Sequence, residues 1–266
     1  MVDMTPENLL KEGRLDEALQ GLTAQVRGNP ADPKVRVFLF QLLALLGQWE
    51  RAQNQLKMSA ELDPLNTLMM EAYGRALAGE LDRQQVVAGV RSPMVIGEPA
   101  AWLALLLQAL KLQAEDRHAQ AQPLRGQAFE QADAVAGEID GTPFEWIADA
   151  DPRFGPCLEM IVNGGYAWVP FTRLQSLVFE EPVDLRDKIW APVQVTWSNG
   201  GQAVGFVPAR YPGTEHSADG ELVLARRTDW SDLGHECFAG CGQRMLTTDA
   251  GDHPLLDIRN ITFRPA

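Results

Sequence analysis

Side chains that could bind zinc lie close together near the C-terminal end of the sequence. His235, Cys237 and Cys241 supply an imidazole and two thiols, which are groups that zinc prefers as ligands. Their spacing matches none of the common zinc-finger or zinc-ribbon patterns, and a free cysteine often serves as a small buried apolar residue. The pattern therefore favours buried thiols, and no metal or cofactor is predicted. The residues that could supply a fourth ligand are His216, His253 and Cys157.

Acidic residues that could catalyse hydrolysis lie around a tryptophan in the middle of the chain. Glu145, Asp149 and Asp151 flank Trp146, and a glycosidase requires a pair of such carboxyl groups. No other acid or base stands at a recognisable spacing from them, and such residues commonly form a solvated edge or the entry to a strand. No catalytic residue is predicted, and the protein is expected not to be an enzyme. The alternative hypothesis is a zinc- or carboxylate-dependent hydrolase in the C-terminal part, with the N-terminal part as a targeting arm.

The elements that would position these side chains are predicted to be strands. From about residue 140 onward, glycine, proline, tryptophan and β-branched residues become more frequent, and apolar residues alternate or run in short blocks. Residues 163–165 and 198–201 contain the Asn-Gly pairs that are typical of hairpin turns. We expect a small antiparallel β-barrel or bent sheet in residues 141–266. The predicted strands are residues 157–163, 166–170, 175–180, 191–197, 203–208, 243–248 and 255–263.

The N-terminal part contains an internal repeat. Four residues recur after a displacement of 34, which is the period of the tetratricopeptide repeat. Each repeat of this kind is a pair of helices, in which the glycine forms the turn, the alanine and leucine pack between the helices, and the proline ends the second helix. Stacked repeats form a concave surface that binds a peptide or a helix. The recurring pairs are Gly13 and Gly47, Ala18 and Ala52, Leu22 and Leu56, and Pro30 and Pro64.

Helical spacing of apolar residues continues to about residue 138. Thr5 and Pro6 have the types expected at an N-cap and at the first helical position. A third, looser repeat has Gly79 near the place of the turn glycine. We expect a tetratricopeptide-like helical domain in residues 1–140, and therefore an α+β chain of two domains. The predicted helix pairs are residues 5–12 with 15–28, 33–46 with 48–61, 65–78 with 81–90, and 98–114 with 116–138.

Charge and composition exclude several classes of partner. The chain has a formal net charge of −13, whereas nucleic acids and anionic membranes attract clustered lysine and arginine. The most apolar segments, residues 37–46 and 100–110, are too short to cross a bilayer. The first residues carry charges where a signal peptide requires an apolar core, and the three cysteines form no disulfide framework. We therefore expect a cytoplasmic protein that binds neither nucleic acid nor membrane.

The predicted binding surface is the concave side of the repeats. Its mixture of apolar and polar residues suits an amphipathic helix lying in a groove. For Val37, Leu45 and Leu68, packing against neighbouring helices explains the residue type equally well. The residues that the repeat alignment places on this side are Lys34, Val37, Gln41, Ala44 and Leu45 in the second repeat, and Leu68, Glu71 and Arg75 in the next.

Several longer segments resemble one known family. Together with the helical half, they cover nearly the whole chain, and segments of this length in this order are more specific than a short motif. They are similar to the ImpE/TagJ family, also known as SciE-type virulence proteins, which are accessory proteins of bacterial type VI secretion. The segments are residues 144–156, 162–171, 184–192, 210–213, 225–230, 242–246 and 254–259.

The resemblance implies a cytoplasmic, non-enzymatic adaptor. Members of the family bind the N-terminal helix of TssB, the small subunit of the contractile sheath, and are linked to the ClpV ATPase that dismantles contracted sheaths. The family has no motif of catalytic residues to carry over to this sequence. A repeat groove that accepts a helix agrees with this function, although the resemblance assigns no residue to the groove.

Overall fold

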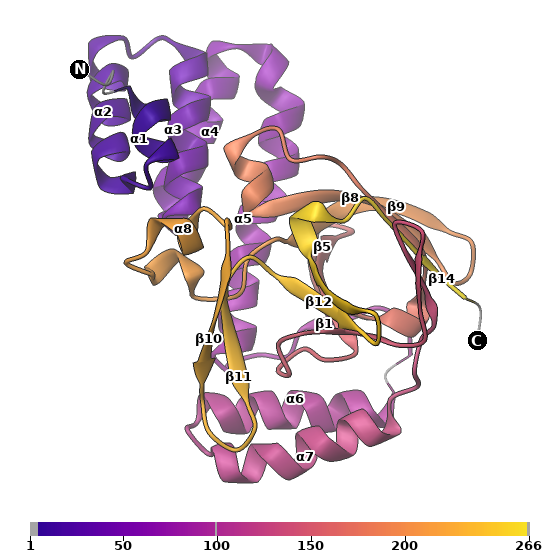
Figure 1. The fold of residues 1–266 in the computed structure, drawn as a ribbon. Coiled ribbons are helices and arrows are strands. Elements are labelled where there is room, and N and C mark those ends of the chain that lie inside the picture. Colours follow the sequence, from indigo (N-terminus) through magenta and orange to yellow (C-terminus); the bar gives the residue numbers. More distant parts are fainter. Residues whose placement is uncertain (1–4, 99, 265–266) are drawn as a thin grey trace.

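A stack of helices lies along one face of a bent sheet (Figure 1). The computed structural model describes residues 5–98 and 100–264. The predicted α+β class is confirmed, and the sheets of the described residues are bent rather than closed into a barrel. Residue 99, which lies in the predicted helix 98–114, is outside the described residues. The helices are α1 (Pro6–Lys11), α2 (Leu15–Gly28), α3 (Pro33–Leu45), α4 (Trp49–Leu62), α5 (Thr67–Val87), α6 (Ala101–Ala114), α7 (His118–Gln131) and α8 (Gly220–Val223).

The first two helix pairs have the geometry of tetratricopeptide repeats. Gly13 and Gly47 form the turns at φ 73° and 67°, a conformation that glycine adopts without steric cost. Ala18 and Ala52 are completely buried between the helices. The Thr5 hydroxyl accepts a hydrogen bond from the Asn8 amide at 3.4 Å, as expected of an N-cap. The predicted pairing of the first four helices is therefore confirmed.

The third predicted helix pair is wrong, because α5 is one continuous helix of 21 residues. Gly79 was expected near a turn, but it lies inside this helix. A Cβ atom at Gly79 would lie 2.8 Å from Cδ1 and Cγ1 of Ile161 in the sheet. Gly79 therefore allows a close approach of helix and sheet. In Figure 1, α5 runs from the repeats along the sheet towards α6 and α7.

The strands form one large sheet and two small ones. The large sheet has nine strands in the order β1-β6-β5-β9-β8-β7-β14-β2-β3, and the small sheets have the orders β10-β11 and β13-β12-β4. The strands are β1 (Met94–Val95), β2 (Gly137–Ile139), β3 (Thr142–Phe144), β4 (Ile147–Asp149), β5 (Cys157–Val162), β6 (Gly165–Pro170), β7 (Leu174–Phe179), β8 (Trp190–Trp197), β9 (Gln202–Pro208), β10 (Thr228–Asp232), β11 (Phe238–Gly242), β12 (Met245–Thr248), β13 (Gly251–Pro254) and β14 (Asn260–Phe263).

The pairing of β5 with β6 begins at the predicted hairpin turn. Asn163 and Gly164 both have positive φ, at 52° and 86°, as a two-residue hairpin turn with an Asn-Gly sequence requires. The helical and sheet parts are also joined directly, because β1 comes from the helical half and pairs with β6. The boundary predicted between residues 140 and 141 falls between β2 and β3.

The two faces of the large sheet belong to different apolar cores. On β5, alternate residues such as Leu158 and Met160 face the inner side of the bent sheet and pack in its core. Ile161 lies on the outer side and belongs to the core shared with the helices. Trp168 on β6 and Trp190 on β8 are completely buried in the same shared core. One of these two cores is therefore formed jointly by the two predicted domains.

A buried ionic network joins α5 to the sheet. The guanidinium of Arg83 on α5 donates hydrogen bonds to both carboxylate oxygens of Glu159 on β5, at 2.9 and 2.8 Å. Arg244, between β11 and β12, forms a second ion pair with Glu159 and another with Asp149 on β4. The Tyr166 hydroxyl donates to Glu159. The Glu159 and Arg244 side chains are completely buried, so their charges are compensated inside the protein.

The electrostatics of Glu159 follow from this arrangement. Burial by itself disfavours the charged carboxylate. The opposing charges of Arg83 and Arg244, with hydrogen bonds from Arg83 and Tyr166, nevertheless lower the pKa of Glu159 to about 2. Because this value is below the ordinary pKa of 4.5, the ionised group stabilises the fold fully above about pH 4.5. That contribution is lost as the pH falls towards 2.

The contact of Gly79 with Ile161 predicts opposite effects at two glycines of α5. Gly79→Ala should lower the free energy of unfolding by about 1 kcal/mol or more, because the added methyl group overpacks a rigid core. Gly74→Ala is the matched control, since nothing lies within 4 Å of a Cβ atom there. It should raise stability by up to about 1 kcal/mol through helix propensity. Urea unfolding followed by circular dichroism measures both, and equal effects would contradict the close approach of α5.

The ionic network predicts a pH-dependent loss of stability in Glu159→Gln. At about pH 7 this variant should lose about 3–5 kcal/mol, because Arg83 and Arg244 keep buried charges without their common partner. The difference from the unchanged protein should shrink as the pH falls from about 4.5 to about 3, because the unfolded chain then binds a proton on Glu159 while the folded protein, with a pKa of about 2, does not. Asp82 also lies on α5, and Asp82→Asn, which removes its exposed ion pair with Arg91, should cost at most about 1 kcal/mol. Urea unfolding at about pH 7 and about pH 3 measures the loss of stability in both variants. Equal losses in Glu159→Gln and Asp82→Asn would contradict the network.

Candidate protein-binding site

The structure separates the predicted groove residues into two groups. On α3, Gln41 and Leu45 are 6% and 0% exposed. The 3₁₀ helix η3 (Leu185–Lys188) packs against α3, and Arg210 donates a hydrogen bond to the Leu45 carbonyl at 3.0 Å. The protein's own β region therefore covers this end of the α3 surface. Ala44 is also completely buried.

The turn between α3 and α4 is covered in the same way. A Cβ atom at Gly47 would lie 2.6 Å from Cγ of Glu215, in the 3₁₀ helix η4 (Thr214–His216). Nearer the start of α3, Lys34 is exposed and Val37 is half-buried. Only this first part of the α3 surface is therefore open to a partner.

On α5, the predicted residues form an exposed stripe. Leu68 is 79% exposed, and Glu71 and Arg75 are also exposed. Their spacing of three, four and seven residues places them on one side of the helix. Glu71 and Arg75 are four residues apart and are therefore neighbours on the helix. They form no ion pair with each other or with any other described residue. This stripe combines an uncovered leucine with two charges that are open to a partner.

Tyr73, on another side of α5, holds the helix against the sheet. Its ring lies 5.1 Å from the ring of Phe206 on β9, between centroids, and the guanidinium of Arg186 lies 4.6 Å from the Tyr73 centroid. Arg186 belongs to η3, which also packs on α3. Burial raises the pKa of Tyr73 well above its ordinary value. The covered side of α5 is thus fixed by aromatic and cation–π contacts, and the stripe is left on the open side.

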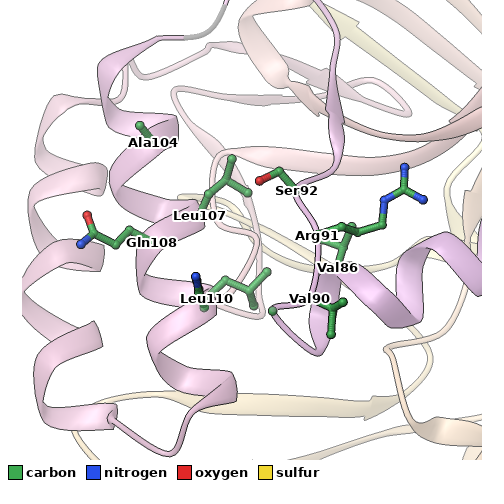
Figure 2. A pocket seen from close by; sticks show the side chains of 10 residues that line it. Val86, Val90, Arg91, Ser92, Ala104, Leu107, Gln108 and Leu110 are labelled. Carbon is green, nitrogen blue, oxygen red and sulfur yellow. The ribbon is translucent and has the colours of Figure 1, made fainter.

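A pocket of about 460 Å³ lies where α5 meets α6. Figure 2 shows Val86 near the end of α5, and Val90 and Ser92 in the segment after it, opposite Leu107 and Leu110 of α6 across this pocket. Arg91 forms an ion pair with Asp82. None of the residues predicted as binding, metal-ligating or catalytic lies in this pocket. Its lining contains no acidic side chain that could pair with a base.

The candidate zinc ligands do not converge. Cys237 is buried, its thiol donates to Oε1 of Gln113 at 3.3 Å, and burial raises the pKa of this thiol. His235 is exposed, while Cys241 lies half-buried on β11. The residues proposed as a fourth ligand lie on other elements: His216 ends η4, His253 on β13 contacts Thr248, and Cys157 begins β5. Within the described residues, no group of three or more His, Cys, Asp or Glu side chains is arranged to hold a metal ion.

The candidate catalytic carboxylates are separated by burial. Asp151 is completely buried and forms a 2.5 Å ion pair with Arg153, whereas Glu145 is exposed. Burial raises the pKa of Asp149 to about 7 although Arg244 opposes the shift. A carboxyl group with such a pKa could serve as a general acid. However, Asp149 is only 3% exposed, and its oxygens bind Arg244 and the Tyr211 hydroxyl.

Sequence analysis did not identify the residues that position the stripe. Arg83, Glu159 and Arg244 are distant in sequence, and each is of a type that is usually exposed. A partial signal was present in the pattern of β5, where Glu159 interrupts an otherwise apolar strand. A charge in such a strand requires a buried partner. That partner could not be named without the fold.

No helix of the described residues combines the length and the apolar character needed to span a bilayer. The comparisons with known proteins agree with the two-part organisation. A family model described as a tetratricopeptide repeat matches residues 9–72. Another, described as ImpE protein, matches residues 141–262. A crystal structure of a protein from Vibrio parahaemolyticus superposes with a TM-score of 0.89 over 97% of both chains at 24% identity, which shows a shared fold.

One relative extends the similarity to the sequence of almost the whole chain. It is the type VI secretion system accessory component TagJ of Pseudomonas aeruginosa strain PAO1. The two sequences are 49% identical over 264 residues, which cover 99% of this chain and 92% of the relative. The expected resemblance is therefore confirmed. Because of this relative and the ImpE match, the chain belongs to the ImpE/TagJ family.

Proposed function

We propose that this protein is an adaptor of a type VI secretion system that binds an amphipathic helix of the small sheath subunit, TssB. The observation that carries the proposal is the exposed stripe of Leu68, Glu71 and Arg75 on α5. It lies in a protein that is 49% identical to an accessory component of type VI secretion. Capture of a helix is the recognition mode that suits such a surface.

Burial of apolar side chains would supply the affinity, and charged side chains would set the position of the partner helix along the surface. Leu68 would enter the apolar face of the incoming helix, while Glu71 and Arg75 would pair with charges at its rim. Lys34 and Val37 on α3 belong to the same proposed surface, because they are the predicted α3 residues that remain accessible. Gln41 and Leu45 are left out, since both are buried.

The proposed adaptor would also link the sheath to the ClpV ATPase, in the cytoplasm where the sheath is dismantled. This part of the proposal rests on the family relationship. A non-enzymatic role is supported by the burial of Asp149 and Asp151, whose oxygens are bound by arginines. A hydrolase using these carboxyl groups would need them open to a substrate.

Isothermal titration with a synthetic peptide of the N-terminal TssB helix tests the proposed function. The unchanged full-length protein should bind this peptide at one site, and a scrambled peptide of the same composition should not bind. Absence of heat with the native peptide at concentrations well above the micromolar range would contradict the proposal.

The role of the stripe predicts a selective loss of affinity in Leu68→Asp. The charge would be forced against the apolar face of the peptide, so the Kd should rise at least about tenfold, the equivalent of about 1.4 kcal/mol. Leu81→Asp is the matched control, because Leu81 is 48% exposed on the same helix and lies on another side. It should leave the Kd unchanged. Equal Kd values for the two variants would remove the stripe from the proposed site.

A further inference from the structure

Another pocket, of about 400 Å³, lies where the end of α7 meets β4. Small side chains lie together in its lining, because Ala148 on β4 is the register partner of Thr247 on β12, and directly opposed residues of antiparallel strands point to the same face. Ala150, which follows β4, also lines the pocket. In Figure 1, α7 lies at the end of α5 that is remote from the repeats. The pocket is therefore separate from the stripe in the first turns of α5.

Two exposed aromatic side chains line this pocket. Phe129 on α7 is 40% exposed, and Trp146, directly before β4, is 41% exposed. Neither ring contacts another aromatic ring or a guanidinium group within residues 5–98 and 100–264. The faces of aromatic rings attract cations. Both rings are therefore available to a positively charged group from another molecule.

The ring of Phe129 is positioned by the backbone beside it. Gly155 has a φ of 49°, a conformation that glycine adopts without steric cost. A Cβ atom at Gly155 would lie 2.4 Å from Cε1 of Phe129, so the lack of a side chain leaves room for the ring. The Gly155 carbonyl also accepts a hydrogen bond from the Asp149 amide on β4 at 2.7 Å. The same glycine thus contacts two elements that line the pocket.

The charged side chains that line the pocket are acidic. Among the described residues, the lining contains Asp133 and Asp149 but no lysine, arginine or histidine. Asp149 is not available to a ligand, because its oxygens already bind Arg244 and the Tyr211 hydroxyl. Asp133 is exposed, and its carboxylate forms no ion pair or hydrogen bond with any residue that the structure describes. The pocket is therefore complementary to a positive charge.

We propose that this pocket binds an arginine side chain that a protein partner presents. The aliphatic part of that side chain would lie on Ala148 and Ala150. Its guanidinium would stack on the ring of Trp146 and donate hydrogen bonds to the carboxylate of Asp133. The inference goes beyond the proposed function, because it assigns a second binding surface that does not involve the stripe.

The size and the chemistry of the pocket favour arginine over other ligands. Its volume of about 400 Å³ is near the low end of the range of about 300–1,000 Å³ for small-molecule sites, which suits one side chain and its neighbouring backbone. Asp133 would repel a phosphate or a nucleic acid. The ammonium of lysine is more strongly hydrated than the planar guanidinium, which stacks on aromatic rings. An uncharged apolar side chain would cover the rings but would bring no partner for Asp133.

Titration of the full-length protein with N-acetyl-arginine amide, followed by NMR, tests the pocket. The indole N–H resonance of Trp146 should shift in a saturable manner with a Kd of about 1–10 mM, as expected of a ligand of this size. The Trp230 resonance is the internal control, because Trp230 is 38% exposed on β10 and does not line the pocket. It should not shift. N-acetyl-citrulline amide has nearly the same shape without the charge, and its Kd should be at least about tenfold higher.

Two variants separate the contributions of the carboxylate and the ring. Asp133→Asn should raise the Kd for the arginine amide at least about threefold, because it removes the opposite charge. Asp16→Asn is the matched control, since Asp16 is exposed on α2, and it should leave the Kd unchanged. Trp146→Leu keeps an apolar side chain but removes the ring, so it should also raise the Kd at least about threefold. The Ala148 amide resonance reports binding in this last variant, and circular dichroism checks that each variant is folded.

Each outcome decides for or against the assigned ligand. Tighter binding of the arginine amide than of the citrulline amide, weakened by Asp133→Asn and Trp146→Leu but not by Asp16→Asn, supports it. Equal binding of N-acetyl-citrulline amide or N-acetyl-norleucine amide would show no preference for a cation and would overturn it. An unchanged Kd in either pocket variant, or no saturable shift at concentrations well above the expected Kd, would overturn it as well. The TssB peptide takes no part in this experiment, so its failure would leave the proposed function standing.

Discussion

The carboxylate of Glu159 determines how the two parts of this protein sit against each other. It is completely buried and bound by Arg83 from α5 and Arg244 from the β11–β12 connection. None of these charges could remain in the interior without the others, since an unpaired buried ion costs several kcal/mol. Gly79 acts in the same contact by letting α5 approach Ile161. The position of α5 on the sheet is therefore fixed by the buried ion pairs of Glu159 and by the lack of a side chain at Gly79.

This placement explains why the repeats present an unusual surface. In a free stack of repeats, the concave side would be open along its length. Here η3 and Arg210 cover the end of α3, while the exposed stripe lies in the first turns of α5, directly after the second repeat. The accessible surface is thus displaced from the second repeat to the start of α5.

Sequence analysis predicted the parts of the fold that depend on local signals. The turn glycines, the N-cap at Thr5 and the Asn163–Gly164 hairpin each follow from a few neighbouring residues, and all were found as expected. It failed at Gly79, because a helical glycine packed on a distant strand has the same local pattern as a turn glycine. The short β1 depends on pairing with β6 across a long separation in the sequence. Of the predicted binding residues, Leu68, Glu71 and Arg75 are exposed. Gln41 and Leu45 are buried, and the contact of Leu45 with Arg210 joins residues that are far apart in the sequence.

A rigid junction has a consequence for recognition. Binding costs free energy when mobile groups become ordered, and a binding helix that moved independently of the sheet would carry that cost. Here α5 is packed against the sheet, because the ring of Tyr73 on α5 contacts the ring of Phe206 on β9. The stripe on α5 is therefore held in one position relative to the sheet before any partner binds. For an adaptor, the buried ions would then act on affinity indirectly, by keeping α5 in place against the sheet.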